Sequence, residues 1–241
     1  MRTGHPDFRW LLAASAWLGL LGCHAAPPAA SAVWWTSAVG LDSPASIPKA
    51  IEQPWQAPVA AAKDGASASI TNCASGLDLQ AKGYTAIAER DGQALQSLTV
   101  RCLALRAIQQ AKPASQSALA KFELTPAVVN LLPPGLSLIV SNDDQRRVQA
   151  AVEKGQTWKD LEPTLRASSP SPGVIELNTD STASTLRVLA GGADFDGDGW
   201  EDLLIEVSHA LKGGSYRSVR LALVTRKSTQ GPLVFVKDLV P

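Results

Sequence analysis

The stretch Asp194-Phe195-Asp196-Gly197-Asp198-Gly199-Trp200-Glu201-Asp202 leads directly into the apolar run Leu203-Leu204-Ile205. Carboxylates fall at every second position around two glycines, which is typical of a short loop that curls around a cation. The apolar run that follows has the composition of a buried strand. We therefore expect a metal-binding loop that feeds a β-strand, and we take this hairpin as the centre of the domain.

Calcium is the cation that this ligand set favours. It takes six to eight oxygens at ~2.3–2.6 Å, whereas magnesium prefers fewer protein ligands and retained waters. Gly199, at position six of the loop, can adopt the positive φ that a sharp turn requires, and Gly197 keeps the backbone path clear. The expected ligands are the carboxylates of Asp194, Asp196, Asp198 and Asp202 and the backbone carbonyl of Trp200.

The order Asp-x-Asp-Gly-Asp-Gly-x-x-Asp followed by a strand resembles the calcium loops of FG-GAP repeats in integrin-like propellers. The resemblance implies calcium binding through the same five residues, and it covers residues 194–205 only. An EF-hand is disfavoured, because Ile205 stands where that motif places a bidentate Glu. The chain has one copy of the motif, so the propeller fold and the adhesive role do not carry over.

A simpler alternative for the loop is an Asp-Gly hairpin turn with solvated acids. A turn needs one or two such residues. Four carboxylates this close together would repel one another without a counter-ion, which favours the calcium interpretation. In that interpretation the ion is structural and ties the turn between two strands.

The chain after residue 173 is rich in β-forming residues separated by Gly, Ser, Asn and Asp. Gly213-Gly214-Ser215 and Ser228-Thr229-Gln230-Gly231 are hairpin-turn sequences, so we predict an antiparallel β-meander. The expected strands are residues 174–177, 185–190, 203–208, 216–226 and 233–239.

The preceding part of the chain shows helical periodicity. Leu95, Leu98, Cys102 and Leu105 recur at spacings of three, four and three, which places them on one face of a helix. Asp91-Gly92 is expected to break the chain before this helix. The expected helices are residues 77–88, 95–111, 114–122 and 145–154, with a short strand or an extended segment at 136–140 and an exposed loop at 168–173. The predicted class is α+β, with a helical N-terminal half packed on a C-terminal antiparallel β-meander.

The first residues predict export and a lipid anchor. Arg2 and Arg9 precede an apolar run too short to span a bilayer, which is the order of a signal peptide over residues 1–22. Leu20-Leu21-Gly22-Cys23 resembles the lipobox of bacterial lipoproteins, which implies lipidation of Cys23 and membrane attachment. The alternative is an ordinary signal peptide with a cysteine near its end. His24 after the cysteine favours the outer over the inner membrane.

Three regions follow from this organisation. Residues 1–22 form the signal peptide, residues 23–69 are rich in Ala, Pro and Ser and are expected to be a flexible tether, and residues 70–241 form a single calcium-binding domain. Within the tether, Trp34-Trp35 is expected to rest at the membrane interface or to make a non-specific apolar contact. Residues 41–55 are expected to pack back onto the domain as an irregular arm.

The remaining cysteines, Cys73 and Cys102, form an even pair in an exported chain, which predicts a disulfide; two buried thiols are the alternative. Without residues 1–22 the charge changes from 22 basic and 22 acidic residues to 20 and 21, a net charge of −1. This balance, without a basic cluster, argues against nucleic acid as a partner.

Evidence for an enzyme is sparse. His209 is the only histidine outside the signal and tether and belongs to no catalytic motif, and the Ser46-Ile47-Pro48-Lys49 match to Ser-x-x-Lys lies in the tether. We therefore expect a non-enzymatic envelope lipoprotein whose partner is an envelope protein or a glycan. The alternative is a periplasmic or surface hydrolase, or a hydrolase subunit, with the acidic loop at its cleft. A second polar cluster in a pocket beside Asp202 would favour the hydrolase.

Overall fold

The computed structural model describes residues 32–120 and 122–241. Its main element is a seven-stranded antiparallel sheet, in which β5 to β10 follow one another in chain order and β1 pairs with β7. The strands are β1 (Trp34–Trp35), β5 (Arg166–Ser171), β6 (Val174–Asn178), β7 (Thr182–Ala193), β8 (Asp202–Leu211), β9 (Arg217–Thr225) and β10 (Val234–Leu239). All five predicted strands are present, and the α+β class is confirmed. The loop predicted at residues 168–173 is wrong in part, because β5 covers residues 168–171 and only 172 and 173 form the turn to β6.

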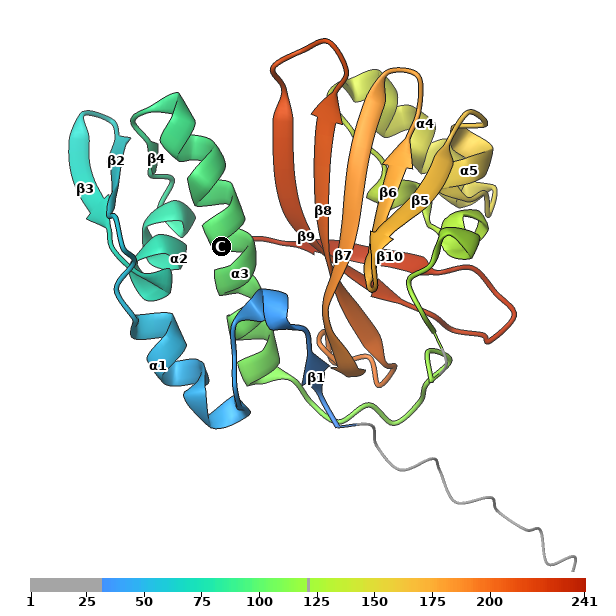
Figure 1. Cartoon of the computed structure of the whole chain (residues 1–241), viewed down its shortest axis with the longest axis horizontal. Helices are drawn as coiled ribbons and strands as arrows, with labels where there is room; N and C mark the ends of the chain where they lie inside the picture. Colours follow the sequence, from blue (N-terminus) through green and yellow to red (C-terminus); the bar gives the residue numbers. More distant parts are fainter. Residues whose placement is uncertain (1–31, 121) are drawn as a thin grey trace, which may run out of the picture.

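One face of this sheet packs on the long helix α3 (Glu89–Gln110), as Figure 1 shows. Side chains of alternate strand residues point toward the helix, among them Leu204 of β8 and Leu221 and Leu223 of β9. Two shorter helices, α1 (Ile47–Glu52) and α2 (Cys73–Ala81), extend the same core. Apolar residues alternate along β9 because one face of the strand packs on this core.

The opposite face is covered by short helices from the middle of the chain (Figure 1). Their most deeply buried large side chain is Trp158, which packs with Leu132 and Leu136 against residues such as Ile205 and Val207 of β8. Because both faces are buried, β8 reads as a nearly continuous apolar run rather than an alternating one. The covering elements are η3 (Pro126–Leu131), η4 (Pro134–Leu136), α4 (Asn142–Glu153) and α5 (Trp158–Leu161).

A second, three-stranded sheet lies on the far side of α3 from the large sheet (Figure 1). It consists of β2 (Val59–Lys63), β3 (Ala66–Ile70) and β4 (Thr85–Ala86), and Leu95 of α3 packs against it. A flexible tether through residue 69 is therefore wrong for residues 32–69. Its alanines alternate between buried and exposed positions in a hairpin, and sequence periodicity cannot distinguish such residues from a bland linker.

The segment before this hairpin also belongs to the folded domain. It contains η1 (Ser37–Val39), η2 (Pro44–Ser46) and α1, and the side chains of Val39 and Ile47 are buried in the α3 core. The expected arm at residues 41–55 is thus packed on the domain. The signal peptide predicted for residues 1–22, and Cys23, lie outside the described residues.

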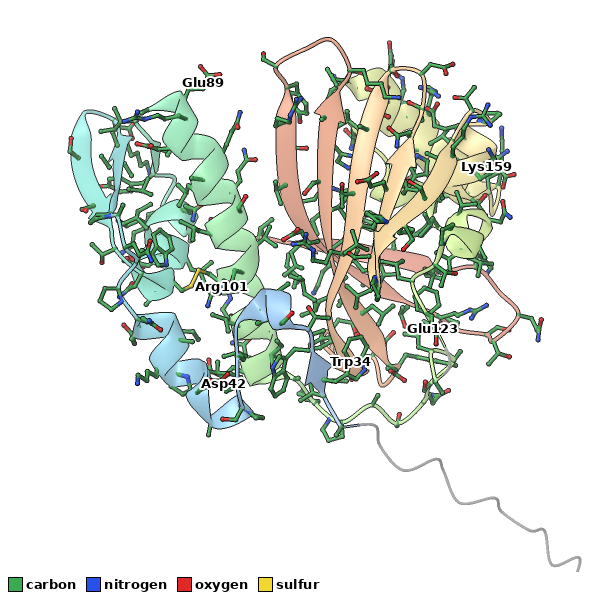
Figure 2. All side chains as sticks on the ribbon, viewed as in Figure 1. Trp34, Asp42, Glu89, Arg101, Glu123 and Lys159 are labelled. Carbon is green, nitrogen blue, oxygen red and sulfur yellow. A yellow bond between two sulfur atoms is a disulfide. The ribbon has the colours of Figure 1, made fainter. Side chains whose placement is uncertain are left out.

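The tryptophan pair is part of the sheet. Trp34 and Trp35 pair with Gly191 and Ala190 of β7, and the Trp35 Nε1–H donates to the Leu41 carbonyl at 3.0 Å. A Cβ atom on Gly191 would lie 2.6 Å from the Trp34 ring, so only glycine allows this approach. Trp34, labelled in Figure 2, nevertheless remains 43% exposed.

Two helix boundaries differ from the sequence prediction. Asp91 and Gly92 lie in the first turn of α3 and do not break the chain. Backbone N–H groups of a first turn have no intrahelical partner, and acidic residues there interact favourably with the helix dipole. The helix predicted at 77–88 begins instead at Cys73, after the N-cap Asn72, and ends before Gly83, whose φ is +88°.

The helix predicted at residues 114–122 is wrong. The described part of this segment contains no helix, and its Gln116 makes an isolated β-bridge to Trp200, next to a second bridge between Lys112 and Asp194. Residues 136–140 form the end of η4 and an irregular stretch rather than a strand. The helix predicted at 145–154 is present as α4, with the Ser141 side chain accepting a hydrogen bond from the Asp144 N–H as its cap.

The disulfide between Cys73 and Cys102 joins the first turn of α2 to the middle of α3, with a Cα–Cα distance of 5.2 Å. Figure 2 shows it as a yellow bond between the two helices. Both residues are buried in the α3 core, so the bond fastens the layer that covers one face of the sheet.

Candidate metal centre

The acidic loop joins β7 to β8, which are neighbouring strands in the middle of the large sheet. It begins after Ala193 and ends at Asp202, and these two residues are register partners. Gly197 and Gly199 have φ values of +90° and +86°, which are left-handed conformations that side-chain-bearing residues rarely adopt. The two predicted turn glycines therefore have the expected role.

Asp194 organises the loop around its own carboxylate. Its Oδ1 accepts hydrogen bonds from the N–H groups of Asp196, at 3.2 Å, and Gly197, at 2.6 Å. Its Oδ2 accepts from the Gly199 N–H at 2.9 Å. Three backbone donors thus point inward and bend residues 194–199 into a tight loop.

The other carboxylates continue this pattern. The Asp196 Oδ1 accepts from the Asp198 N–H at 3.1 Å, and the Asp198 Oδ1 accepts from the Trp200 N–H at 2.8 Å. The Asp202 Oδ2 accepts from the Phe195 N–H at 2.9 Å, which connects the two ends of the loop. The spacing of two between carboxylates therefore matches the turns that the loop makes.

Asp194, Asp196 and Asp202 are brought together. Each offers a carboxylate oxygen, and these oxygens lie within 4.8 Å of one another. Asp202 is 0% exposed and Asp194 is 5% exposed. The Asp202 Oδ1 is buried and has no hydrogen-bond partner in the described part of the chain. An unpaired buried carboxylate oxygen is costly, because it has lost its water without gaining a donor or a cation.

The pKa of Asp202 reflects this environment. It is raised from 3.8 to about 7, mainly by burial and to a smaller extent by the charges of Asp196 and Asp198, while the Phe195 N–H and the Thr225 hydroxyl oppose the shift. Without a cation, the site therefore holds Asp202 close to a balance between its protonated and ionised forms at neutral pH. A cation beside the three carboxylates would favour the ionised form.

Asp198 lies apart from this triad. Its carboxylate forms an ion pair with Lys227, and the Lys227 Nζ lies 5.1 Å from the centre of the Trp200 ring. The hydrogen bond from Lys227 lowers the pKa of Asp198, and the Trp200 N–H contributes to the shift. The carboxylate of Asp198 and the carbonyl of Trp200 therefore remain predicted ligands, whereas the other three are already assembled.

The sequence prediction missed a segment that supports the loop. Residues 112–116, expected to be helical in part, lie along the outside of the loop and bond to its backbone at residues 194, 199 and 201. Lys112-Pro113 signalled only the end of α3. No local pattern predicted this contact, because it joins residues about 80 positions apart and uses backbone atoms.

Two further acidic residues, Glu201 and Glu206, lie on either side of Asp202 and the apolar run that follows it. The Glu201 side chain is buried, and its Oε2 has no hydrogen-bond partner in the described chain. The Glu201 carbonyl accepts from the Thr225 hydroxyl at 2.9 Å, which ties the end of the loop to β9. Glu206 forms an ion pair with Arg187 of β7 at 3.5 Å.

His209 lies near the opposite end of β8, seven residues or about 23 Å along the strand from Asp202. Its Nδ1 is 2.8 Å from the Ser184 Oγ, its ring packs edge-on to Trp158, and its Nε2 has no partner in the described chain. Burial, and then the charge of Arg220, lower its pKa to about 3, so the ring is neutral at physiological pH. These contacts make His209 a buried packing residue.

Ser46 and Lys49 lie at the start of α1. The Ser46 hydroxyl donates to the Ser43 carbonyl at 2.6 Å, a local turn interaction. Two sizeable cavities, each of about 510–520 Å³, are present elsewhere in the described structure. One lies between the residue 53–59 segment and α3, the other between α4 and β10, and neither is lined by a residue of the acidic loop.

Comparisons with models of protein families, with curated protein sequences and with solved structures found no match to this chain. Within the described residues, the helices are too short or too polar to cross a membrane. The acidic loop and the residues around it are therefore the basis for inferring a function.

Proposed function

We propose that the protein is a lipid-anchored envelope protein that binds one calcium ion through Asp194, Asp196 and Asp202 and acts as a non-enzymatic binding or scaffolding protein. The observation that carries the calcium site is the carboxylate of Asp202, which lies beside those of Asp194 and Asp196 and whose buried Oδ1 has no hydrogen-bond partner among the described residues. A divalent cation would supply the missing partner of this oxygen and would offset the repulsion within the triad.

Calcium fits this site better than other ions. The assembled donors are all oxygens, which hard cations prefer, and no cysteine or histidine is among them. Three carboxylates leave room for the predicted Trp200 carbonyl and for Asp198, after its release from Lys227, to complete a set of six or more oxygens. Magnesium would retain several waters and would use fewer of these groups.

A binding or scaffolding role fits the position of the loop. The loop ties the end of a β-hairpin, and neither of the two cavities reaches it, so the hydrolase alternative gains no support. In this proposal the helices of the first half act as backing for the C-terminal meander, which is supported by the packing of α3 on β9. The partner is an envelope protein or a glycan.

The proposed anchor is lipid on Cys23, with the outer membrane as the favoured location. Cys23→Ser is expected to release the protein into the soluble fraction, as followed by fractionation and immunoblotting. Continued membrane retention of this variant would contradict the lipid anchor and leave the calcium proposal untouched.

The calcium proposal is tested by titrating chelator-treated protein with CaCl₂ in a calorimeter. We expect one site, preference over MgCl₂ and, at about 1,000 times the Kd, roughly 4 kcal/mol of added stability. Asp202→Asn is expected to lower the affinity at least tenfold. Asp180→Asn, which removes an exposed carboxylate in the β6–β7 turn, is the matched control and is expected to bind as the parent does. Absence of both heat and thermal stabilisation in the parent protein would overturn the proposal.

A further inference from the structure

The connection between the two covering layers passes directly over the acidic loop. Residues 111–125, which we call the crossover, run from the end of α3 on one face of the large sheet to η3 on the other (Figure 1). Leu119 and Leu124 of the crossover are buried in the core of the second face. The position of the crossover therefore affects how both layers rest on the sheet.

The first part of the crossover, residues 112–116, is held to both ends of the acidic loop by backbone hydrogen bonds. Lys112 and Asp194 exchange two, with the Lys112 N–H at 3.0 Å from the Asp194 carbonyl and the Asp194 N–H at 2.9 Å from the Lys112 carbonyl. The Gly199 carbonyl accepts from the N–H groups of Ser115, at 2.9 Å, and Gln116, at 3.0 Å.

Two further bonds close the contact. The Ser115 hydroxyl donates to the same Gly199 carbonyl at 2.9 Å, and the Glu201 N–H donates to the Gln116 carbonyl at 2.8 Å. A Cβ atom on Gly199 would lie 2.9 Å from the Ser115 Oγ, so the two segments are in close contact here.

The same loop residues serve both the triad and the crossover. The Asp194 carboxylate faces the triad and holds the Gly199 N–H, while the Asp194 backbone and the Gly199 carbonyl face the crossover. If Asp194 moved to relieve repulsion from Asp196 and Asp202, both sets of crossover bonds would be disturbed. The fully buried, unpaired Asp202 Oδ1 marks the position at which a cation would prevent that movement.

We propose that this site is a calcium-dependent clamp on the crossover. Calcium bound by Asp194, Asp196 and Asp202 holds the loop in the shape that accepts residues 112–116, and the docked crossover in turn raises calcium affinity, because coupling between two binding events is reciprocal. This inference rests on the proposed calcium site. When calcium leaves, the crossover detaches first, and the buried residues Ala114, Ala118 and Leu119 become accessible.

Hydrogen exchange, followed by mass spectrometry on the intact protein with CaCl₂ or with chelator, tests this clamp. Calcium is expected to slow exchange in peptides covering residues 111–120 at least fivefold, whereas peptides covering α5 serve as the internal reference and change little. Asp202→Asn is expected to show the fast rate in both conditions.

A matched pair of variants tests the reciprocal effect. Gln116→Pro removes the N–H that bonds to Gly199, and Gln116→Ala keeps it, so only the proline variant is expected to weaken calcium binding, by fivefold or more. Ser115→Ala, which deletes the hydroxyl bond alone, provides a milder variant if the proline prevents folding. Calcium binding in calorimetry with unchanged exchange at residues 111–120 would overturn the clamp and leave the site intact. No calcium binding would overturn both.

Discussion

The disulfide and the acidic loop fasten two different regions of the molecule in two different ways. Cys73–Cys102 joins α2 to α3 within a buried apolar layer. The acidic loop joins β7 to β8 and holds the crossover, and it contains a buried carboxylate oxygen without a partner. The disulfide carries no charge and needs no further partner, whereas the loop has an excess of negative charge at its centre.

The disulfide and the acidic loop therefore respond differently to solution conditions. A disulfide stabilises mainly by restricting the unfolded chain, and it does so at any salt or metal concentration in an oxidising compartment. A carboxylate cluster stabilises only while a cation occupies it, so its contribution rises with the concentration of that cation. The helical layer is therefore expected to stay folded under conditions in which the loop and the crossover loosen.

Removal of the disulfide should lower overall stability more than protonation of His209 or loss of the Asn72 helix cap. The paired variant Cys73→Ala/Cys102→Ala opens a loop with a sequence separation of 29 residues, for which chain entropy predicts a loss of about 3.5 kcal/mol. Urea unfolding monitored by circular dichroism measures this loss. Because the two fastenings share no residues, calcium affinity should stay within twofold of the parent. A large drop in affinity would mean that the two regions are not independent.

The buried His209 provides a pH response that is opposite in sign to that of Asp202, whose raised pKa favours proton uptake by the folded, calcium-free protein. Its pKa is about 3 in the folded protein against 6.5 in an ordinary environment, so the unfolded chain takes up a proton first as pH falls. Stability is therefore lost on acidification, by about 1.5 kcal/mol between pH 6.5 and 5 from this residue. Urea unfolding in that window measures the slope.

The control for this pH response is the double variant Ser184→Ala/His209→Leu, which removes the titrating ring together with the hydroxyl that it contacts. Its stability should change less between pH 6.5 and 5, even if its absolute stability differs. An identical slope in the parent and the double variant would show that His209 is not the source.

The smallest expected effect concerns the start of the disulfide-bearing helix α2. The Asn72 side chain accepts from the Ser75 N–H at 2.8 Å and caps the helix, so Asn72→Ala should cost about 1 kcal/mol. Ser43→Ala, at the start of η2, removes a side chain without a cap hydrogen bond and is the matched control. Equal losses in the two variants would show that the cap adds nothing beyond the disulfide.

Much of the fold could be predicted from local patterns. The strands of the meander, the capped helix α4 and the apolar face of α3 depend on residues close together in the chain, where periodicity and turn residues are informative. The Cys73–Cys102 pair was predicted by counting cysteines in a chain that we expect to be exported, and the structure contains it. The curled path of the acidic loop likewise follows from alternating Asp residues that bond to nearby N–H groups.

The errors have a common physical origin in long-range contacts. Ala61 and Ala62 look like linker residues until they pair with Ala86 and Thr85 of β4, and Trp34 takes its place only because Gly191 leaves room for it. Ala114 to Ala118 carries a helical composition, but the backbone there bonds to the acidic loop. In each case a partner distant in sequence overrides a weak local preference.

The acidic loop shows the same division within one site. The proximity of Asp194, Asp196, Asp198 and Asp202 around two glycines can be predicted from the sequence, because these residues lie within nine positions of one another. The burial of Asp202 at the start of β8, and the ion pair of Asp198 with Lys227, 29 residues further along the chain, appear only in the folded protein. Burial and ion pairing depend on residues that are distant in the sequence, so the spacing of a motif does not predict them.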